Sequence, residues 1–186
     1  QGEIIWGFAN GIDFSPVLGE PAANKGYGNS TTTPYDVTDE ETAKQVLLSL
    51  SETVGRRLRA DGVEAGLVSV GIRYADMAYV SHQKVLAVPT NLTWEIYEAG
   101  CRLFGELWNG RPLRHMGVHT GRVNGESFVR QMSIFDETDY EKLMRMDKAV
   151  DVIRRRFGAD AVMRAVFLNN SISHMSGGIE NVMKLH

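Results

Sequence analysis

The sequence predicts an α+β fold, a βαββαβ domain with a four-stranded, mainly antiparallel sheet, two helices on one face and a C-terminal helical extension. Between residues 25 and 125, stretches in which apolar and polar residues alternate enclose two stretches with apolar residues at helical spacing. A glycine follows each helical stretch, as is common where a helix ends. The strands are expected near residues 25–33, 65–74, 78–87 and 111–122.

Residues 1–24 precede this domain. Ile4, Ile5 and Phe8 have the spacing of one helix face, and Gly11 follows as a stop signal. The prolines and small residues after it predict a loop. We therefore expect the end of a preceding unit and a linker.

The first helix is expected to begin with a capping box of Thr38 and Glu41. Its last turn holds Arg56, Arg57 and Arg59, where cations complement the helix dipole. We interpret these arginines as a solvated helix end in preference to a nucleic-acid contact, an alternative that stays open. The apolar residues of this helix lie on one stripe: Ala43, Val46, Leu47, Leu50, Val54 and Leu58.

The second helix is expected over residues 92–109. Its Cys101 is interpreted as a structural thiol, because no neighbouring base would activate it. The third strand has an ambiguous parity, since the apolar Val80 and Leu86 fall on the same face as His82 and Lys84. The sequence therefore does not decide which face of this strand is covered.

The expected strands contain no Asp or Glu, although the whole chain carries a net charge of −3. The sheet face opposite the helices is expected to carry small and polar residues instead of large apolar ones. Basic side chains and hydroxyl groups are typical of surfaces that contact a nucleic-acid backbone without reading bases. The cations in these strands are Lys25, Arg73, Lys84, Arg111, Arg114 and Arg122.

The pattern changes after residue 125. Residues 126–139 are polar, and a helix is expected over residues 140–157 with Leu143, Val150 and Ile153 on its apolar stripe. Three arginines, residues 154–156, end this helix, and we interpret them as solvated in preference to a nucleic-acid patch.

An ordered set of segments resembles the C-terminal part of Y-family, lesion-bypass DNA polymerases, with the bacterial UmuC/DinB-like branch as the best fit. The stretch from Trp6 to Val17 resembles the end of the thumb, and Lys25 to Thr31 resembles the opening of the little finger. The resemblance continues through Ile72-Arg73, Ser81-His82-Gln83, Val88-Pro89-Thr90 and the stretch from Arg111 to Val118.

The resemblance implies four parts. Residues 1–24 would be the end of the thumb and a linker, and residues 25–125 the little-finger DNA-binding domain. Residues 126–139 would be a linker with a clamp-binding-like peptide, and residues 140–186 a C-terminal helical extension and tail.

In this family the little finger lies in the major groove of template–primer duplex and grips the phosphates of both strands. His115 and His119 stand where relatives often have Arg or Lys, so we expect a weaker, pH-dependent grip at these positions. The resemblance implies DNA contacts at Asn29, Ser30, Arg73, Ser81, His82, Gln83, Lys84, Arg114, His115 and His119.

The peptide Gln131-Met132-Ser133-Ile134-Phe135 resembles the peptide by which bacterial polymerases bind the sliding clamp. In an extended peptide, Met132, Ile134 and Phe135 would enter apolar pockets while Gln131 fixes the register by hydrogen bonding. The alternative is that Ile134 and Phe135 pack against the following helix.

The family's chemistry is two-metal phosphoryl transfer, with Mg²⁺ held by carboxylates of a palm domain. This chain begins at Gln1 and has no palm-like carboxylate motif, so we expect a fragment without catalytic residues, a metal site or a cofactor of its own. The Mg²⁺ is expected in the palm of the parent polymerase.

The expected partners are duplex template–primer DNA and the sliding clamp, for a monomeric cytoplasmic protein without membrane contact. Two alternatives stay open. An RRM-like RNA-binding module has the same element order, but it needs exposed aromatic residues, for which Tyr27 and Tyr79 are the candidates. In a protein-interaction adaptor, the sheet would be an ordinary solvated face and the peptide around Phe135 the functional element.

Overall fold

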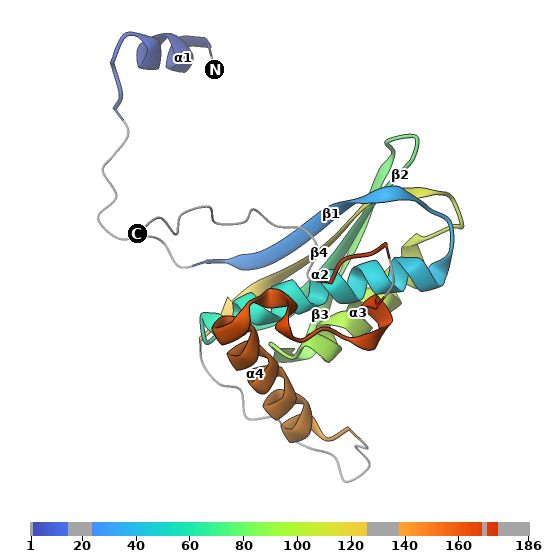
Figure 1. Cartoon of the computed structure of the whole chain (residues 1–186). Coiled ribbons are helices and arrows are strands. Elements are labelled where there is room, and N and C mark those ends of the chain that lie inside the picture. The colour runs from blue at the N-terminus through green and yellow to red at the C-terminus, as the bar shows by residue number, and fades with distance from the viewer. Residues whose placement is uncertain (1, 15–23, 126–137, 169–170, 175–186) are drawn as a thin grey trace.

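A computed structural model describes residues 2–14, 24–125, 138–168 and 171–174 (Figure 1). Its sheet has the strand order β1-β4-β2-β3, and all three strand pairs are antiparallel. The predicted α+β class and βαββαβ order are confirmed. The elements are α1 Gly2–Ala9, β1 Gly26–Val37, α2 Glu40–Ala60, β2 Glu64–Tyr74, β3 Tyr79–Thr90, α3 Thr93–Leu107, β4 Leu113–Asn124, α4 Tyr140–Phe157, and the short 3₁₀ helices η1 Ala159–Ala161 and η2 Ala165–Phe167.

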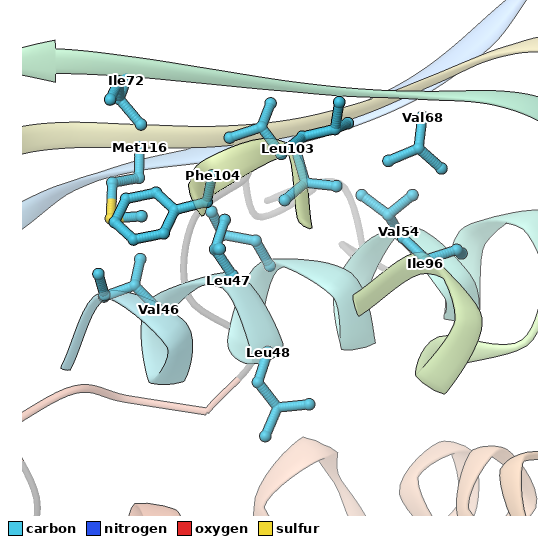
Figure 2. Close-up of a cluster of buried hydrophobic side chains, with 14 of the residues drawn as sticks. Val46, Leu47, Leu48, Val54, Val68, Ile72, Ile96, Leu103, Phe104 and Met116 are labelled. Atoms are coloured by element: carbon cyan, nitrogen blue, oxygen red, sulfur yellow. The ribbon is translucent and has the colours of Figure 1, made fainter. Parts of the chain in front are cut away.

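The core lies between the sheet and the helices α2 and α3, which cover the same sheet face (Figure 1). Figure 2 shows Val68 and Ile72 of β2 and Met116 of β4 above Leu47 and Phe104 from the helices. All five side chains are buried. Burying one such side chain contributes about 1.5–3 kcal/mol, so this layer orients the sheet and leaves its other face uncovered.

Helix α2 is buried on two sides. Its predicted stripe faces the sheet, but Leu48 points the opposite way, toward the C-terminal segment (Figure 2). Phe167 and Ile172 of that segment belong to the same core cluster. Ser49 Oγ donates a hydrogen bond of 2.8 Å to the backbone oxygen of Ser173. The C-terminal extension is therefore a third layer, on the side of the helices away from the sheet.

The start of α2 differs from the expected capping box by one residue. Asp39 is the N-cap, and its carboxylate accepts a 2.7 Å hydrogen bond from the backbone nitrogen of Thr42. This bond holds the pKa of Asp39 below its usual value. A carboxylate at this position also gains from the helix dipole, which favours Asp39 over the neutral Thr38.

Helix α3 has no side-chain cap from its own N-cap residue, Leu92. The backbone nitrogen of Thr93 instead donates to Asp147 of α4, at 2.8 Å. The C-terminal layer thus satisfies a helix end that the preceding sequence leaves uncapped.

Helix α4 faces α2 through charged residues. Asp147 and Arg154 are its buried residues, whereas Ile153 is 37% exposed. The residues predicted to share one apolar stripe are not the buried residues of α4: Ile153 is exposed, and Leu143 and Val150 are half-buried. Charged residues of α4 are buried because α2 places Glu52 and Arg59 opposite this helix, where they form ion pairs with Arg154 and Asp147.

The arginines of the last turn of α2 are structural. Arg59 lies 3.0 Å from Asp147 and 2.6 Å from Asp151, and it also donates to the backbone oxygen of Asn91. Arg57 donates a 2.8 Å hydrogen bond to the backbone oxygen of Gly28. The interpretation of Arg59 as solvated is wrong, because Asp147 and Asp151 of α4 enclose its guanidinium, while Arg57 is half-buried against β1.

β1, β2 and β3 are longer than expected, and β4 is shifted along the chain. β1 continues to Val37 and so includes Asp36, while β2 begins at Glu64. The carboxylate-free pattern of the predicted strands therefore does not hold at the strand ends, although it holds in the middle of the sheet. Within the described residues, no helix is both long and apolar enough to cross a bilayer.

Candidate nucleic-acid interface

The sheet face opposite the helices is built from alternate residues of all four strands. β4 lies between β1 and β2, so the register aligns open-face positions in rows across the sheet. The first row is Thr32, His115, Arg73 and Tyr79; the second is Ser30, Gly117, Gly71 and Ser81; the third is Gly28, His119, Ser69 and Gln83. These rows, which we name the open face, contain no carboxylate.

Glycines allow two rings to lie against the sheet. A Cβ at Gly28 would overlap the imidazole of His119, and a Cβ at Gly71 would overlap the Tyr79 hydroxyl. The His119 ring also approaches Gly117, where a Cβ would lie 3.3 Å from Nε2. The middle of the open face is therefore shallow, because these two rings lie flat over its glycines.

The first row holds the charge of the open face. The Thr32 hydroxyl lies 3.0 Å from His115 Nδ1, and the Arg73 guanidinium carbon lies 5.6 Å from the centre of the Tyr79 ring. Burial, and then the charges of Arg73 and His119, lower the pKa of His115. His115 is therefore neutral at neutral pH, and Arg73 supplies the permanent positive charge of the three rows.

Six of the predicted DNA-contact residues lie on the open face. They are Ser30, Arg73, Ser81, Gln83, His115 and His119. Whether they contact DNA is a proposal, taken up below.

The remaining predicted contact residues lie elsewhere. Asn29 is only 3% exposed and points to the helix side, because neighbouring strand residues face opposite sides and Ser30 is on the open face. His82 also faces the helices, with Nδ1 3.2 Å from a carboxylate oxygen of Glu106 on α3. Neither residue therefore belongs to the open face.

Two basic residues that were predicted to contact DNA, Lys84 and Arg114, lie outside the three rows of the open face. Lys84 pairs in register with the buried Val68, which places it on the helix side of the edge strand β3. Arg114 sits where the β2–β4 register shifts, and its guanidinium lies 3.7 Å from Asp36. The predicted basic face is therefore less basic than the strand composition indicates.

Sequence reasoning did not assign Thr32, Ser69 or Tyr79 to the predicted contact set. A signal was present for Thr32, since Gly26, Gly28, Ser30 and Thr32 continue one period-two series. For Tyr79, only the pairing of β3 with β2 shows that its ring crosses Gly71. The clamp-binding-like peptide, Gln131 to Phe135, lies outside the described residues.

Cys101 is half-buried on α3, and burial raises the pKa of its thiol. The thiol is thus mostly protonated at neutral pH, which agrees with a structural role.

Comparison with known protein families matches residues 24–134 to the impB/mucB/samB family C-terminal domain. The chain belongs to this family. The resemblance to Y-family lesion-bypass polymerases is therefore confirmed, and the matched residues contain the complete sheet of this impB/mucB/samB C-terminal domain.

The curated relatives are polymerases and repair proteins. The chain is 40% identical to DNA polymerase IV 2 of Bacillus subtilis over 174 residues, covering 90% of this chain and 41% of the relative. It is 36% identical to DNA polymerase IV of Clostridium acetobutylicum, covering 90% and 42%. It is 31% identical to the putative UV-damage repair protein UvrX of Bacillus subtilis, covering 89% and 40%. The chain thus spans about two fifths of these relatives.

Two solved structures are similar at lower identity. One is a complex of the beta-clamp processivity factor and the little finger domain of PolIV, with 18% identity, a TM-score of 0.45, and coverage of 60% of this chain and 99% of that chain. The other is a post-insertion binary complex of Dbh DNA polymerase, with 18% identity, a TM-score of 0.47, and coverage of 64% and 34%.

Proposed function

We propose that residues 24–125 are the DNA-gripping domain of a lesion-bypass polymerase and that the open face lies along the sugar–phosphate backbone of template–primer duplex. The observation that carries this proposal is the composition of the open face. It combines one fixed cation, two histidines, hydroxyl groups and glycines without a carboxylate.

This combination suits phosphates better than bases. Arg73 offers charge-assisted hydrogen bonds, while Ser30, Ser81 and Gln83 offer neutral ones. The glycines let the His119 and Tyr79 rings lie flat, so a phosphate backbone can approach the polar side chains of the open face. Because fixed charge is sparse, we expect neutral hydrogen bonds to supply much of the grip.

The peptide from Gln131 to Phe135 is proposed to bind the bacterial sliding clamp. Its support is chemical: apolar residues at positions 132, 134 and 135 follow a glutamine, a pattern suited to a strand-like peptide seated in apolar pockets. The peptide follows the last strand of the DNA-gripping domain directly, so clamp and duplex would be held by adjacent parts of one chain.

The polymerase reaction and its Mg²⁺ are assigned to the part of the longer relatives that this chain does not match. We propose that the chain alone does not extend primers, and that it acts as a monomer in the cytoplasm. A primer-extension assay with Mg²⁺ and all four nucleotides tests the first point, since extension above background would contradict it.

Binding of primed duplex DNA, measured by fluorescence anisotropy at several salt concentrations, tests the DNA-gripping assignment. If Arg73 contacts one phosphate, Arg73→Ala should weaken binding and reduce the slope of log K against log salt by about 1. Arg102→Ala is the matched control, because Arg102 is exposed on α3, behind the sheet. Equal binding by both variants would remove Arg73 from the interface.

One observation favours an RNA-binding alternative. The Tyr79 ring lies across the open face and is 55% exposed, so a base could stack on it. A competition experiment decides between the two, because an RNA-binding module would prefer single-stranded RNA to duplex DNA. An adaptor without a nucleic-acid role would bind neither at low salt.

A further inference from the structure

Helix α4 carries a half-exposed apolar seam beside its docked face. Leu143, Met146, Val150, Ile153 and Phe157 are separated by three and four residues in turn, the spacing of the a and d positions of a coiled coil. Met146 is 40%, Ile153 37% and Phe157 66% exposed. These five residues, which we name the α4 seam, lie next to the buried Asp147 and Arg154; Leu143 and Val150 are half-buried, and the other three are exposed.

The seam is not what holds α4 in place. Ion pairs of Asp147 and Asp151 with Arg59, and of Arg154 with Glu52, anchor the helix. An apolar seam that is left exposed by a polar attachment is available to a further partner.

Acidic and basic side chains are unevenly distributed around α4. Asp147 and Asp151 turn inward, so Glu141 is the remaining acid within the helix, and it is exposed. The exposed cations of the helix are Lys142, Arg145, Lys148, Arg155 and Arg156. By their helical register, Lys142 and Arg156 flank the seam, whereas the other three point away from it. Within the described part of the chain, none of these five forms an ion pair with a carboxylate.

We propose that the α4 seam docks an amphipathic helix of another protein, one with an apolar a/d stripe and acidic residues beside it. The spacing of the seam fits a helix, and Lys142 and Arg156 beside it fit carboxylates. A second copy of this chain fits poorly, because two α4 helices side by side would bring like charges together. Duplex DNA would use the cations but leave the seam uncovered.

The location makes this site independent of the open face. α4 lies beyond α2 and α3, on the side away from the sheet (Figure 1). A partner on the α4 seam therefore does not compete with a duplex held on the sheet, and failure of one proposal leaves the other standing.

The probe is a synthetic amphipathic helical peptide with leucine at a and d and glutamate at the flanking positions, labelled for fluorescence anisotropy with the 186-residue chain. A second peptide with lysine in place of each glutamate controls for charge. The test variant is Met146→Ser combined with Ile153→Ser. The matched control is Met144→Ser, because Met144 is as exposed as Met146, at 39% and 40%, but lies on the other flank of the helix.

We expect the acidic peptide to bind, and more tightly than the lysine peptide by about tenfold or more at low salt, with the preference shrinking as salt rises. The double variant should weaken binding by about tenfold or more, while Met144→Ser leaves it unchanged. Equal binding of both peptides, equal loss in both variants, or no binding at millimolar peptide would overturn the proposal. So would binding of a duplex oligonucleotide that competes with the peptide and is unaffected by the double variant.

Discussion

Replacing Glu52 with glutamine should detach the C-terminal layer from α2. Glu52 is 4% exposed, and its two carboxylate oxygens lie 3.2 Å from Arg154 and 2.7 Å from Arg164. Glu52→Gln keeps the shape of the side chain but removes its negative charge. The buried guanidinium of Arg154 then lacks a counter-charge, and the half-buried Arg164 loses the same partner.

The expected loss follows from burial. Removing one partner of a buried ion pair costs about 3–5 kcal/mol, because a buried charge remains uncompensated. In a chain of this size, a loss of 1 kcal/mol lowers Tm by about 2–4 °C, so we expect Glu52→Gln to lower Tm by about 6–20 °C. Thermal and urea unfolding measure this, and limited proteolysis reports separately whether α4 is released before the sheet domain unfolds.

Two further variants make the interpretation specific. Glu52→Met combined with Arg154→Met should recover much of the loss, because apolar residues of similar volume can replace a buried pair at little cost. Glu40→Gln is the control on the same helix, since Glu40 and Lys44 form an exposed pair at 2.6 Å that contributes little. A loss in Glu52→Gln no larger than in Glu40→Gln would refute the reasoning.

Three other predictions concern binding. Duplex affinity should rise as the solution is acidified below neutral pH, because a phosphate favours the protonated form of His115, whose pKa is lowered by burial in the free protein. His115→Asn should flatten this anisotropy profile, and an unchanged profile would exclude a contribution from His115. Gly28→Ala should displace the His119 ring and weaken duplex binding while far-UV circular dichroism stays constant, and wild-type affinity would show that the flat ring is irrelevant. Phe135→Ala should reduce sliding-clamp binding in surface plasmon resonance by about 10-fold or more without affecting duplex affinity, whereas loss of both would indicate that the peptide packs on the domain.

Local sequence patterns were sufficient to predict the order of helices and strands and to identify the protein family. Alternation along the second and fourth strands correctly separated Val68 and Val70 from Ser69, because the side-chain period of a strand depends on the backbone alone. The ordered motifs also identified the relatives correctly. The same patterns placed the N-cap one residue early, at Thr38, and misjudged Arg59, whose partners Asp147 and Asp151 are distant in the sequence.

The sequence by itself determined the βαββαβ order, the stripes that build the core, and the presence of a sheet face rich in small and polar residues. Only the tertiary structure decided which residues lie on that face. The sequence of the edge strand with His82 and Lys84 fits either orientation, and its pairing with β2 fixes which of its side chains face the helices. The tertiary structure also decided the role of the arginines, since the partners Glu52 and Arg154 are 102 residues apart. A pair at that separation produces no periodic pattern in the sequence. Its contribution to stability depends on both side chains being buried, which happens only when the layers pack.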